Sequence, residues 1–182
     1  MVKIYMVRHG KAAAGFDGHL DPGLNALGLN QAQAAAAELA KLEPMPIYSS
    51  PLARARETAK PLASRWGAQI SIEPRVAEIP SPTKDLAERS SWLRRAMSGT
   101  WNDLTPELQH WRNALIGCLL DLDTDSIIFC HYIAINVAVG AARQDDRLVV
   151  FPPDNGSVTI LSNDAGSLAV LELGRSAETV VN

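Results

Sequence analysis

The sequence predicts an α/β fold of three layers, with helices covering both faces of a central, mostly parallel sheet. Two observations carry this prediction. Short apolar runs typical of strands alternate along the chain with longer segments of helical pattern, and this alternation is typical of parallel sheets. In addition, 182 residues with an apolar content of 47% can bury the core of one domain, which we expect to span residues 1–182.

Six short runs are expected to form the strands of the sheet. They are residues 3–7, 47–49, 70–73, 127–130, 158–161 and 169–173. Helices are expected over residues 25–42, 50–66, 105–122 and 133–142. Asn25 is a typical N-cap, whereas Ser50-Pro51 and Thr105-Pro106 each combine a capping hydroxyl with a proline at the first helical position.

Residues 79–103 do not follow this alternation. They contain Pro80, Pro82, many charged residues, Trp92 and Trp101. We interpret the segment as a variable insertion that lies over the active site. Its arginines and tryptophans fit two arrangements, either a lid that touches a ligand or a solvated basic helix with tryptophans packed beneath it.

Charge and composition argue against several classes of protein. A formal net charge of −3 gives no general attraction to nucleic acid, and no apolar stretch approaches the ~20 residues of a membrane span. The chain begins with a strand pattern in place of a signal sequence, so we expect a cytoplasmic protein. Cys118 and Cys130 lack metal-binding spacing and are expected to be buried, reduced thiols.

Three corners of the predicted fold place cationic groups where a strand ends. Arg8 and His9 follow the first strand, and His131 follows the fourth. Arg54 and Arg56 lie in the first turns of the helix after the second strand. Open α/β sheets bind their ligands at this edge. Such a cluster would hold a phosphate dianion by charge-assisted hydrogen bonds, and nearby cations keep a histidine neutral and able to attack phosphorus.

Helix geometry and chemistry limit which arginine and which carboxylic acid can serve this site. Arg54 and Arg56 are two positions apart on a helix, so their side chains point about 200° apart and cannot both face one small pocket. A carboxylic acid is also needed to protonate a leaving alcohol. Glu78, at the start of the insertion, is the preferred candidate, and Glu73, at the end of the third strand, is the other.

Together these segments resemble the histidine phosphatase superfamily, the phosphoglycerate-mutase-like family with an arginine-histidine-glycine signature. The matching segments are residues 7–10, 21–32, 49–59 and 129–131. The resemblance implies a phosphoglycerate-mutase-like fold and a metal-independent phosphatase that needs no cofactor.

The resemblance also implies a role for each site residue. His9 would be the nucleophile that forms a phosphohistidine intermediate, and Glu78 the proton donor. Arg8, Arg54 and His131 would bind the transferred phosphoryl group, with His131 also counted among the catalytic residues. Arg54 is preferred to Arg56 because only Arg54 fits the family pattern of leucine, any residue, arginine and alanine.

The chain departs from the family pattern at two places. Tyr132 follows the second histidine where the family commonly has glycine, and residues 11–13 lack the polar side chains that mutases carry there. Tyr132, His19 and Trp92 are expected within reach of the substrate, a phosphorylated small molecule or a phosphoprotein. The alternatives to a phosphomonoesterase are a phosphohistidine phosphatase of signalling proteins, a phosphoglycerate-type mutase and a non-catalytic phosphate-binding module.

Overall fold

The computed structural model describes residues 1–15 and 18–177 of the chain. Its strands are β1 (Val2–Arg8), β2 (Ile47–Ser49), β3 (Ile70–Ile72), β4 (Ser126–Cys130), β5 (Val158–Asp164) and β6 (Ser167–Glu172). Its α-helices are α1 (Ala26–Leu39), α2 (Ala53–Trp66), α3 (Leu86–Met97), α4 (Pro106–Leu120) and α5 (Tyr132–Arg143). Two short 3-10 turns are η1 (Pro74–Val76) and η2 (Trp101–Asp103).

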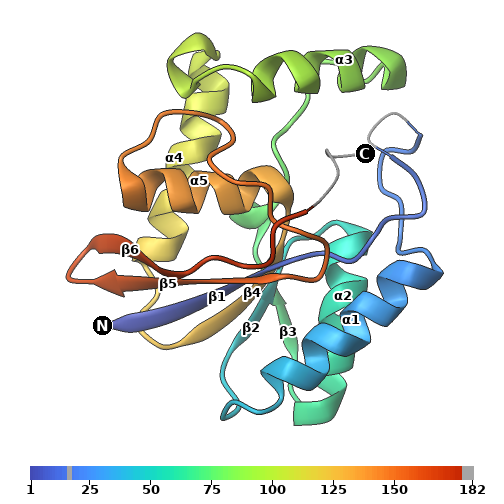
Figure 1. Cartoon of the computed structure of the whole chain (residues 1–182), viewed down its shortest axis with the longest axis vertical. Coiled ribbons are helices and arrows are strands. Elements are labelled where there is room, and N and C mark those ends of the chain that lie inside the picture. The colour runs from blue at the N-terminus through green and yellow to red at the C-terminus, as the bar shows by residue number, and fades with distance from the viewer. Residues whose placement is uncertain (16–17, 178–182) are drawn as a thin grey trace.

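The strands form one sheet in the order β3-β2-β4-β1-β5-β6. The pairs among β3, β2, β4 and β1 are parallel, and β5 and β6 add an antiparallel edge. Helices α1 and α2 cover one face of the sheet, whereas α4 and α5 cover the other (Figure 1). The predicted three-layer fold with a mostly parallel sheet is therefore confirmed.

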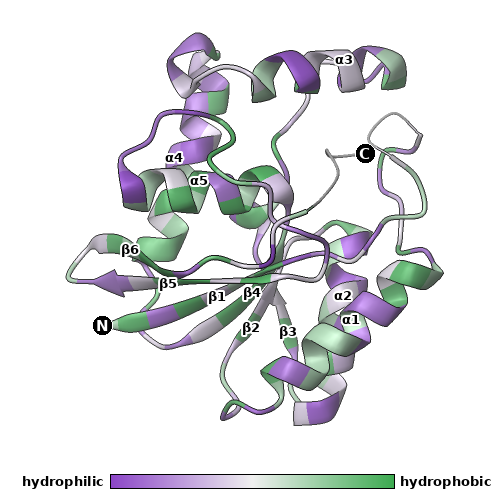
Figure 2. Ribbon diagram, in the orientation of Figure 1, coloured by the Kyte–Doolittle hydropathy of each residue, from purple (hydrophilic) through white to green (hydrophobic). Residues whose placement is uncertain are grey.

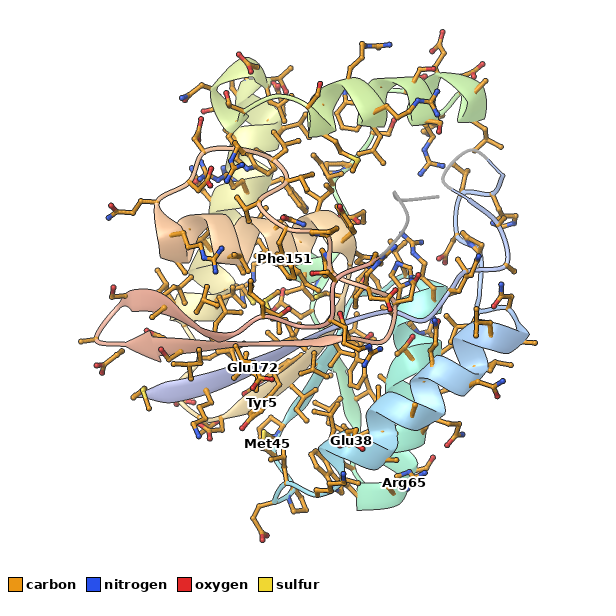
Figure 3. The ribbon with its side chains drawn as sticks, viewed as in Figure 1. Tyr5, Glu38, Met45, Arg65, Phe151 and Glu172 are labelled. Atoms are coloured by element: carbon orange, nitrogen blue, oxygen red, sulfur yellow. The ribbon has the colours of Figure 1, made fainter. Side chains whose placement is uncertain are left out.

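Alternation along the central strands divides the core between the two faces. On β1, Ile4 and Met6 pack with residues of α4 and α5, whereas Tyr5 and Val7 pack with residues of α1 and α2. Figure 2 shows hydrophobic residues along these central strands, as expected for strands buried on both faces. Figure 3 shows Tyr5 on one side of the sheet and Phe151, from the loop after α5, on the other.

The neighbouring strands β1 and β4 send their chains toward opposite faces, because β1 leads to α1 and β4 leads to α5. A crevice at the carboxyl ends of two such strands is where open α/β sheets bind ligands. Ladder hydrogen bonds continue past the strand ends into this region. The His9 N–H donates to the Cys130 carbonyl at 3.0 Å, and the Ser50 N–H donates to the Phe129 carbonyl at 3.0 Å. The sheet itself therefore positions the backbone of the site.

The expected start of the second helix at Ser50 is wrong. Helix α2 begins at Ala53, and its N-cap residue Leu52 makes no side-chain cap. The Ala53 N–H donates instead to Asp21 Oδ1 at 2.8 Å, from the loop after β1. Ser50 stays extended because its backbone continues the ladder between β2 and β4.

The other helix boundaries follow the sequence more closely. Asn25 is the N-cap of α1, and its Oδ1 accepts a hydrogen bond of 2.8 Å from a first-turn N–H. Helix α4 begins directly after Thr105, and α2 ends at Gly67 in the left-handed conformation. Gly67 favours a helix end because it adopts the left-handed conformation without strain. Pro106 favours the start of α4, whereas the Thr105 side chain makes no cap hydrogen bond there.

Residues 79–103 contain α3 and η2, and α3 lies at the top of Figure 1, away from the sheet. Asp85 caps α3 by accepting from two N–H groups of its first turn. Trp101 of η2 is buried in the core beside α4 and α5. The segment is thus packed into the core at Ile79, at Leu93 of α3 and at Trp101, and its nature as a variable insertion stays a prediction.

Candidate active site

A pocket opens where the carboxyl end of β1 meets the start of α2. The loop after β1 and helix α3 form its walls, and it encloses about 500 Å³ with its open mouth included. It is lined by Arg8, His9, Ala12, Ala14, Gly15, His19, Leu20, Pro22, Arg54, Glu78, Arg89, Leu93 and Tyr132. The pocket therefore brings together residues that the sequence singled out in separate segments, among them His9, Arg54 and Glu78.

His9 is held through its Nδ1 atom. Nδ1 lies 2.7 Å from the Gly10 carbonyl oxygen, which can only accept, so Nδ1 carries the ring proton and Nε2 carries the lone pair. The Arg54 Nε–H donates to this Nε2 atom at 3.2 Å. Burial, and then the charges of Arg54 and Arg8, hold the pKa of His9 well below its usual range. The imidazole is therefore neutral, with its nucleophilic nitrogen facing a guanidinium.

The glycine after His9 is required by packing. A Cβ atom at Gly10 would lie 2.4 Å from the carbonyl oxygen of Gly28 on α1. The Gly10 N–H donates to Thr58 Oγ1 at 3.0 Å, and that hydroxyl donates to the Arg54 carbonyl at 2.7 Å. The turn that carries His9 is thus clamped between α1 and α2.

Arg8 and Arg54 give the pocket a cationic floor, although both are less than one-tenth exposed. Arg8 Nη1 donates to the Pro153 carbonyl at 2.8 Å, and its Cζ lies 5.0 Å from the centre of the Tyr132 ring. Within the part of the chain that the structure describes, Arg8 Nε has no hydrogen-bond partner. Desolvation lowers the pKa of both arginines, so a bound anion would offset the free-energy cost of burying these two charges.

The two arginines of α2 separate as the helix geometry predicts. Arg54 is buried and lines the pocket, whereas Arg56 is exposed and does not. A rotation of about 100° per residue accounts for this difference. Arg54 is therefore the arginine in a position to bind a ligand of this pocket.

His131 lies behind the floor of the pocket. It is fully buried and does not line the pocket, and its ring centre lies 5.2 Å from that of His9. Its Nε2 atom lies 2.8 Å from Ser50 Oγ. Its Nδ1 atom is buried without a hydrogen-bond partner among the described residues. Burial, followed by the charge of Arg54, holds the pKa of His131 well below its usual range, so this ring is neutral as well.

Of the two candidate carboxylic acids, Glu78 lies at the pocket. Its carboxylate accepts from the N–H groups of Ile79 at 3.0 Å and Ile133 at 3.2 Å. Burial nevertheless raises the pKa of Glu78. Glu73 does not line the pocket, and its ion pair with Arg75 (2.9 Å) lowers its pKa. Glu78 is therefore the residue that combines a place in the pocket with a tendency to hold a proton.

The three residues expected to reach a substrate are placed differently. Tyr132 and the exposed His19 line the pocket, but Trp92 does not. Trp92 lines two shallow hollows elsewhere on α3 and packs against the core. Arg89 and Leu93 are the α3 residues that line the pocket. They lie together because residues four apart share one face of a helix.

Some residues that hold the site were missed in the sequence. Asn155 Nδ2 donates to the His9 carbonyl at 3.0 Å across 146 positions of the chain, so no local pattern links the two. Thr58 could have been found, because it lies one turn after Arg54 and on the same helix face. Both residues fix the backbone around the proposed nucleophile without lining the pocket.

Three further observations concern the described residues taken together. Across residues 1–15 and 18–177, no three histidine, cysteine, aspartate or glutamate side chains gather closely enough to hold a metal ion. Over the same residues, no helix has the length and apolar content needed to cross a membrane. Cys118 and Cys130 are free and buried, as expected.

Comparison with known proteins shows where this site belongs. The family model of the histidine phosphatase superfamily (branch 1) matches residues 4–175. The chain belongs to this superfamily. A probable phosphoglycerate mutase GpmB of Erwinia tasmaniensis is 29% identical over 158 residues, which are 76% of this chain and 74% of that protein. A glucosyl-3-phosphoglycerate phosphatase of Mycolicibacterium vanbaalenii is 44% identical over 80 residues, which are 42% of this chain and 36% of that protein.

Solved structures of named phosphatases share the fold. A phosphoserine phosphatase from Entamoeba histolytica, in complex with 3-phosphoglyceric acid, has a TM-score of 0.76 at 20% identity and covers 97% of this chain and 98% of its own. A mycobacterial glucosyl-3-phosphoglycerate phosphatase in complex with VO3 has a TM-score of 0.75 at 24% identity and covers 97% and 100%. The predicted phosphoglycerate-mutase-like fold is confirmed, and this histidine phosphatase is an enzyme whose relatives include named phosphatases and mutases.

Proposed function

We propose that this histidine phosphatase is a metal-independent phosphomonoesterase that acts on a small phosphorylated molecule through a phosphohistidine on His9. The observation that carries the proposal is the state of the His9 ring. Its Nδ1 proton is engaged by the Gly10 carbonyl, and its unprotonated Nε2 lies 3.2 Å from Arg54 Nε at the floor of a cationic pocket. A neutral imidazole beside an anion-binding guanidinium is suited to attack on phosphorus.

In the first step, a phosphate dianion binds between His9 and the guanidinium groups of Arg8 and Arg54. The His9 Nε2 lone pair forms a bond to phosphorus while the bond from phosphorus to the ester oxygen breaks. Glu78, whose pKa is raised by burial, acts in its protonated form and gives its proton to the leaving alcohol. The arginines stabilise the charge that spreads over the phosphoryl oxygens in the transition state.

In the second step, water replaces the alcohol. Glu78, now a carboxylate, accepts a proton from that water while the water oxygen attacks phosphorus. The bond from phosphorus to Nε2 breaks, inorganic phosphate leaves, and His9 and Glu78 return to their starting protonation states. His131 and Arg8 bind the phosphoryl group during both steps in this proposal.

A small substrate is favoured by the walls of the pocket. The loop after β1 and the α3 residues Arg89 and Leu93 line it around the cationic floor, which suits a small ester better than a side chain of a folded protein. A phosphoglycerate-type mutase is the second candidate, because the chain is 29% identical to a probable phosphoglycerate mutase. The cytoplasmic location stays a prediction from the sequence.

The experiment is a phosphate-release assay on a panel of phosphomonoesters with a chelator present, comparing the wild type with His9→Ala. The proposal expects turnover that survives the chelator and is lost in the variant. Turnover that the chelator abolishes, or that persists in His9→Ala, would refute it. A requirement for a bisphosphate primer, with phosphoryl exchange in place of phosphate release, would identify a mutase.

A further inference from the structure

His131, which binds the phosphoryl group in the proposed steps, forms a fully buried pair with Ser50, a residue to which those steps give no role. Ser50 Oγ lies 2.8 Å from His131 Nε2 and also accepts from the Leu52 N–H at 3.2 Å. Both side chains are 0% exposed. A buried hydroxyl this close to a ring nitrogen decides which nitrogen of the ring carries the proton.

Counting hydrogens leaves two arrangements. The Ser50 hydroxyl has one hydrogen and two lone pairs, and the Leu52 N–H occupies one lone pair. If His131 Nε2–H donated to the other lone pair, the Ser50 hydrogen would have no acceptor among the residues that the structure describes. If the Ser50 O–H donates to Nε2, the hydroxyl hydrogen has an acceptor while the oxygen still accepts from the Leu52 N–H, and the His131 proton lies on Nδ1.

The second arrangement leaves one buried N–H group without a protein partner, at His131 Nδ1. This group belongs to a ring whose centre is 5.2 Å from the His9 ring. A buried donor without a partner costs free energy, and in this arrangement an oxygen of the phosphoryl group on His9 supplies the missing acceptor. The first arrangement leaves two groups without a protein partner, the Ser50 hydroxyl hydrogen and the unprotonated Nδ1 of His131.

We propose that Ser50 is a positioning residue that holds His131 as the neutral Nδ1–H tautomer, so that His131 donates a hydrogen bond to the phosphoryl group bound at His9. The inference rests on the proposed function for its last step. A neutral donor adds a hydrogen bond without adding a further positive charge beside Arg8 and Arg54.

The tautomer can be read directly by NMR. In protein labelled with 15N at its four histidines, two-bond correlations distinguish a protonated from an unprotonated ring nitrogen. The His131 signals are assigned by elimination with His9→Ala, His19→Ala and His110→Ala. We expect a protonated Nδ1 and an unprotonated Nε2 in the wild type. A protonated Nε2 there would overturn the proposal, whether or not any variant folds.

Variants of the neighbouring residues Ser49 and Ser50 test whether the Ser50 hydroxyl sets the tautomer of His131. Ser50→Ala is expected to release the tautomer toward Nε2–H and to lower kcat/KM about ten- to hundredfold, as for the loss of one charge-assisted hydrogen bond. Ser50→Thr keeps a hydroxyl and should show the Nδ1–H tautomer and the kcat/KM of the wild type. Ser49→Ala is the matched control, because the buried Ser49 hydroxyl donates only to the Ser50 carbonyl, and it should leave the tautomer unchanged. An unchanged tautomer in Ser50→Ala would contradict the proposal.

Inorganic phosphate tests the last step. Saturating phosphate should shift the Nδ1 proton of His131 in the wild type, and an unmoved signal would refute the donation to phosphate. These readouts are independent of turnover. If His9→Ala kept full activity, the proposed function would fail, but the assignment of the His131 tautomer to Ser50 would stand. An Nε2–H tautomer in the wild type would overturn that assignment and leave the proposed function standing.

Discussion

Replacing Arg54 by alanine gives the sharpest test of how the pocket binds phosphate. Arg54 is 8% exposed and its Nε lies 3.2 Å from His9 Nε2. Its N–H groups are therefore within hydrogen-bonding reach of a phosphoryl group bound at His9. A hydrogen bond to a charged group contributes about 1.5–3 kcal/mol, and two are lost in Arg54→Ala, which gives about 3–6 kcal/mol. At about 1.4 kcal/mol per factor of ten, kcat/KM should fall by about 10²–10⁴.

Arg56→Ala is the matched control, because it removes the same charge from the same helix two positions away. Arg56 is exposed and does not line the pocket, so kcat/KM should stay within about twofold. Arg54→Lys should fall between the two, since it keeps the charge but loses the planar fork that binds two oxygens at once. The assay is steady-state phosphate release on the best substrate of the panel.

Thermal unfolding separates catalysis from folding in this series. Burial lowers the pKa of Arg54, which means that the folded protein holds this charge against a desolvation cost. The melting temperature of Arg54→Ala should therefore lie at most a few degrees below that of Arg56→Ala. Equal losses of kcat/KM in the two variants would refute the assignment of Arg54 to the pocket.

Three other variants test separate parts of the site. Glu78→Gln should cost about 10²–10⁴ in kcat on alkyl phosphates but little on p-nitrophenyl phosphate, whose leaving group needs no proton. In the wild type, kcat on alkyl phosphates should fall as pH rises through the raised pKa of Glu78, because the protonated acid is the active form, and a pH-independent kcat would contradict this role. Tyr132→Phe should be nearly silent, whereas Tyr132→Ala should lower kcat/KM about two- to thirtyfold by removing the ring under Arg8; equal effects would shift the role to the hydroxyl. Thr58→Val should lower the free energy of unfolding by about 1–3 kcal/mol, measured in urea, because the buried Gly10 N–H loses its acceptor, while Thr58→Ser should not.

The sequence predicted those parts of the site that depend on strand ends and helix periodicity. Arg8 and His9 lie at the pocket because β1 is parallel to β4 and ends beside it. Arg54 and Arg56 separate because a helix has a fixed rotation per residue. Both rules are local, so one sequence is enough to apply them.

What the sequence did not predict depends on contacts between distant segments. The cap of α2 comes from Asp21, 32 positions before Ala53, so Ser50 was free to bond to His131 instead. Trp92 was expected within reach of the substrate, but the rotation of α3 directs Leu93 to the pocket. Neither outcome can be read from the residues near the position concerned, because tertiary contacts decide both.

The most direct test of the central claim is to trap the covalent intermediate. The wild type is mixed with a 32P-labelled substrate, quenched in alkali within one turnover and digested, and the labelled peptide is identified by mass spectrometry. The mechanism predicts label on His9, stable in alkali and lost in acid, and no label in His9→Ala. Label on another residue, or turnover of His9→Ala at the wild-type rate, would contradict it.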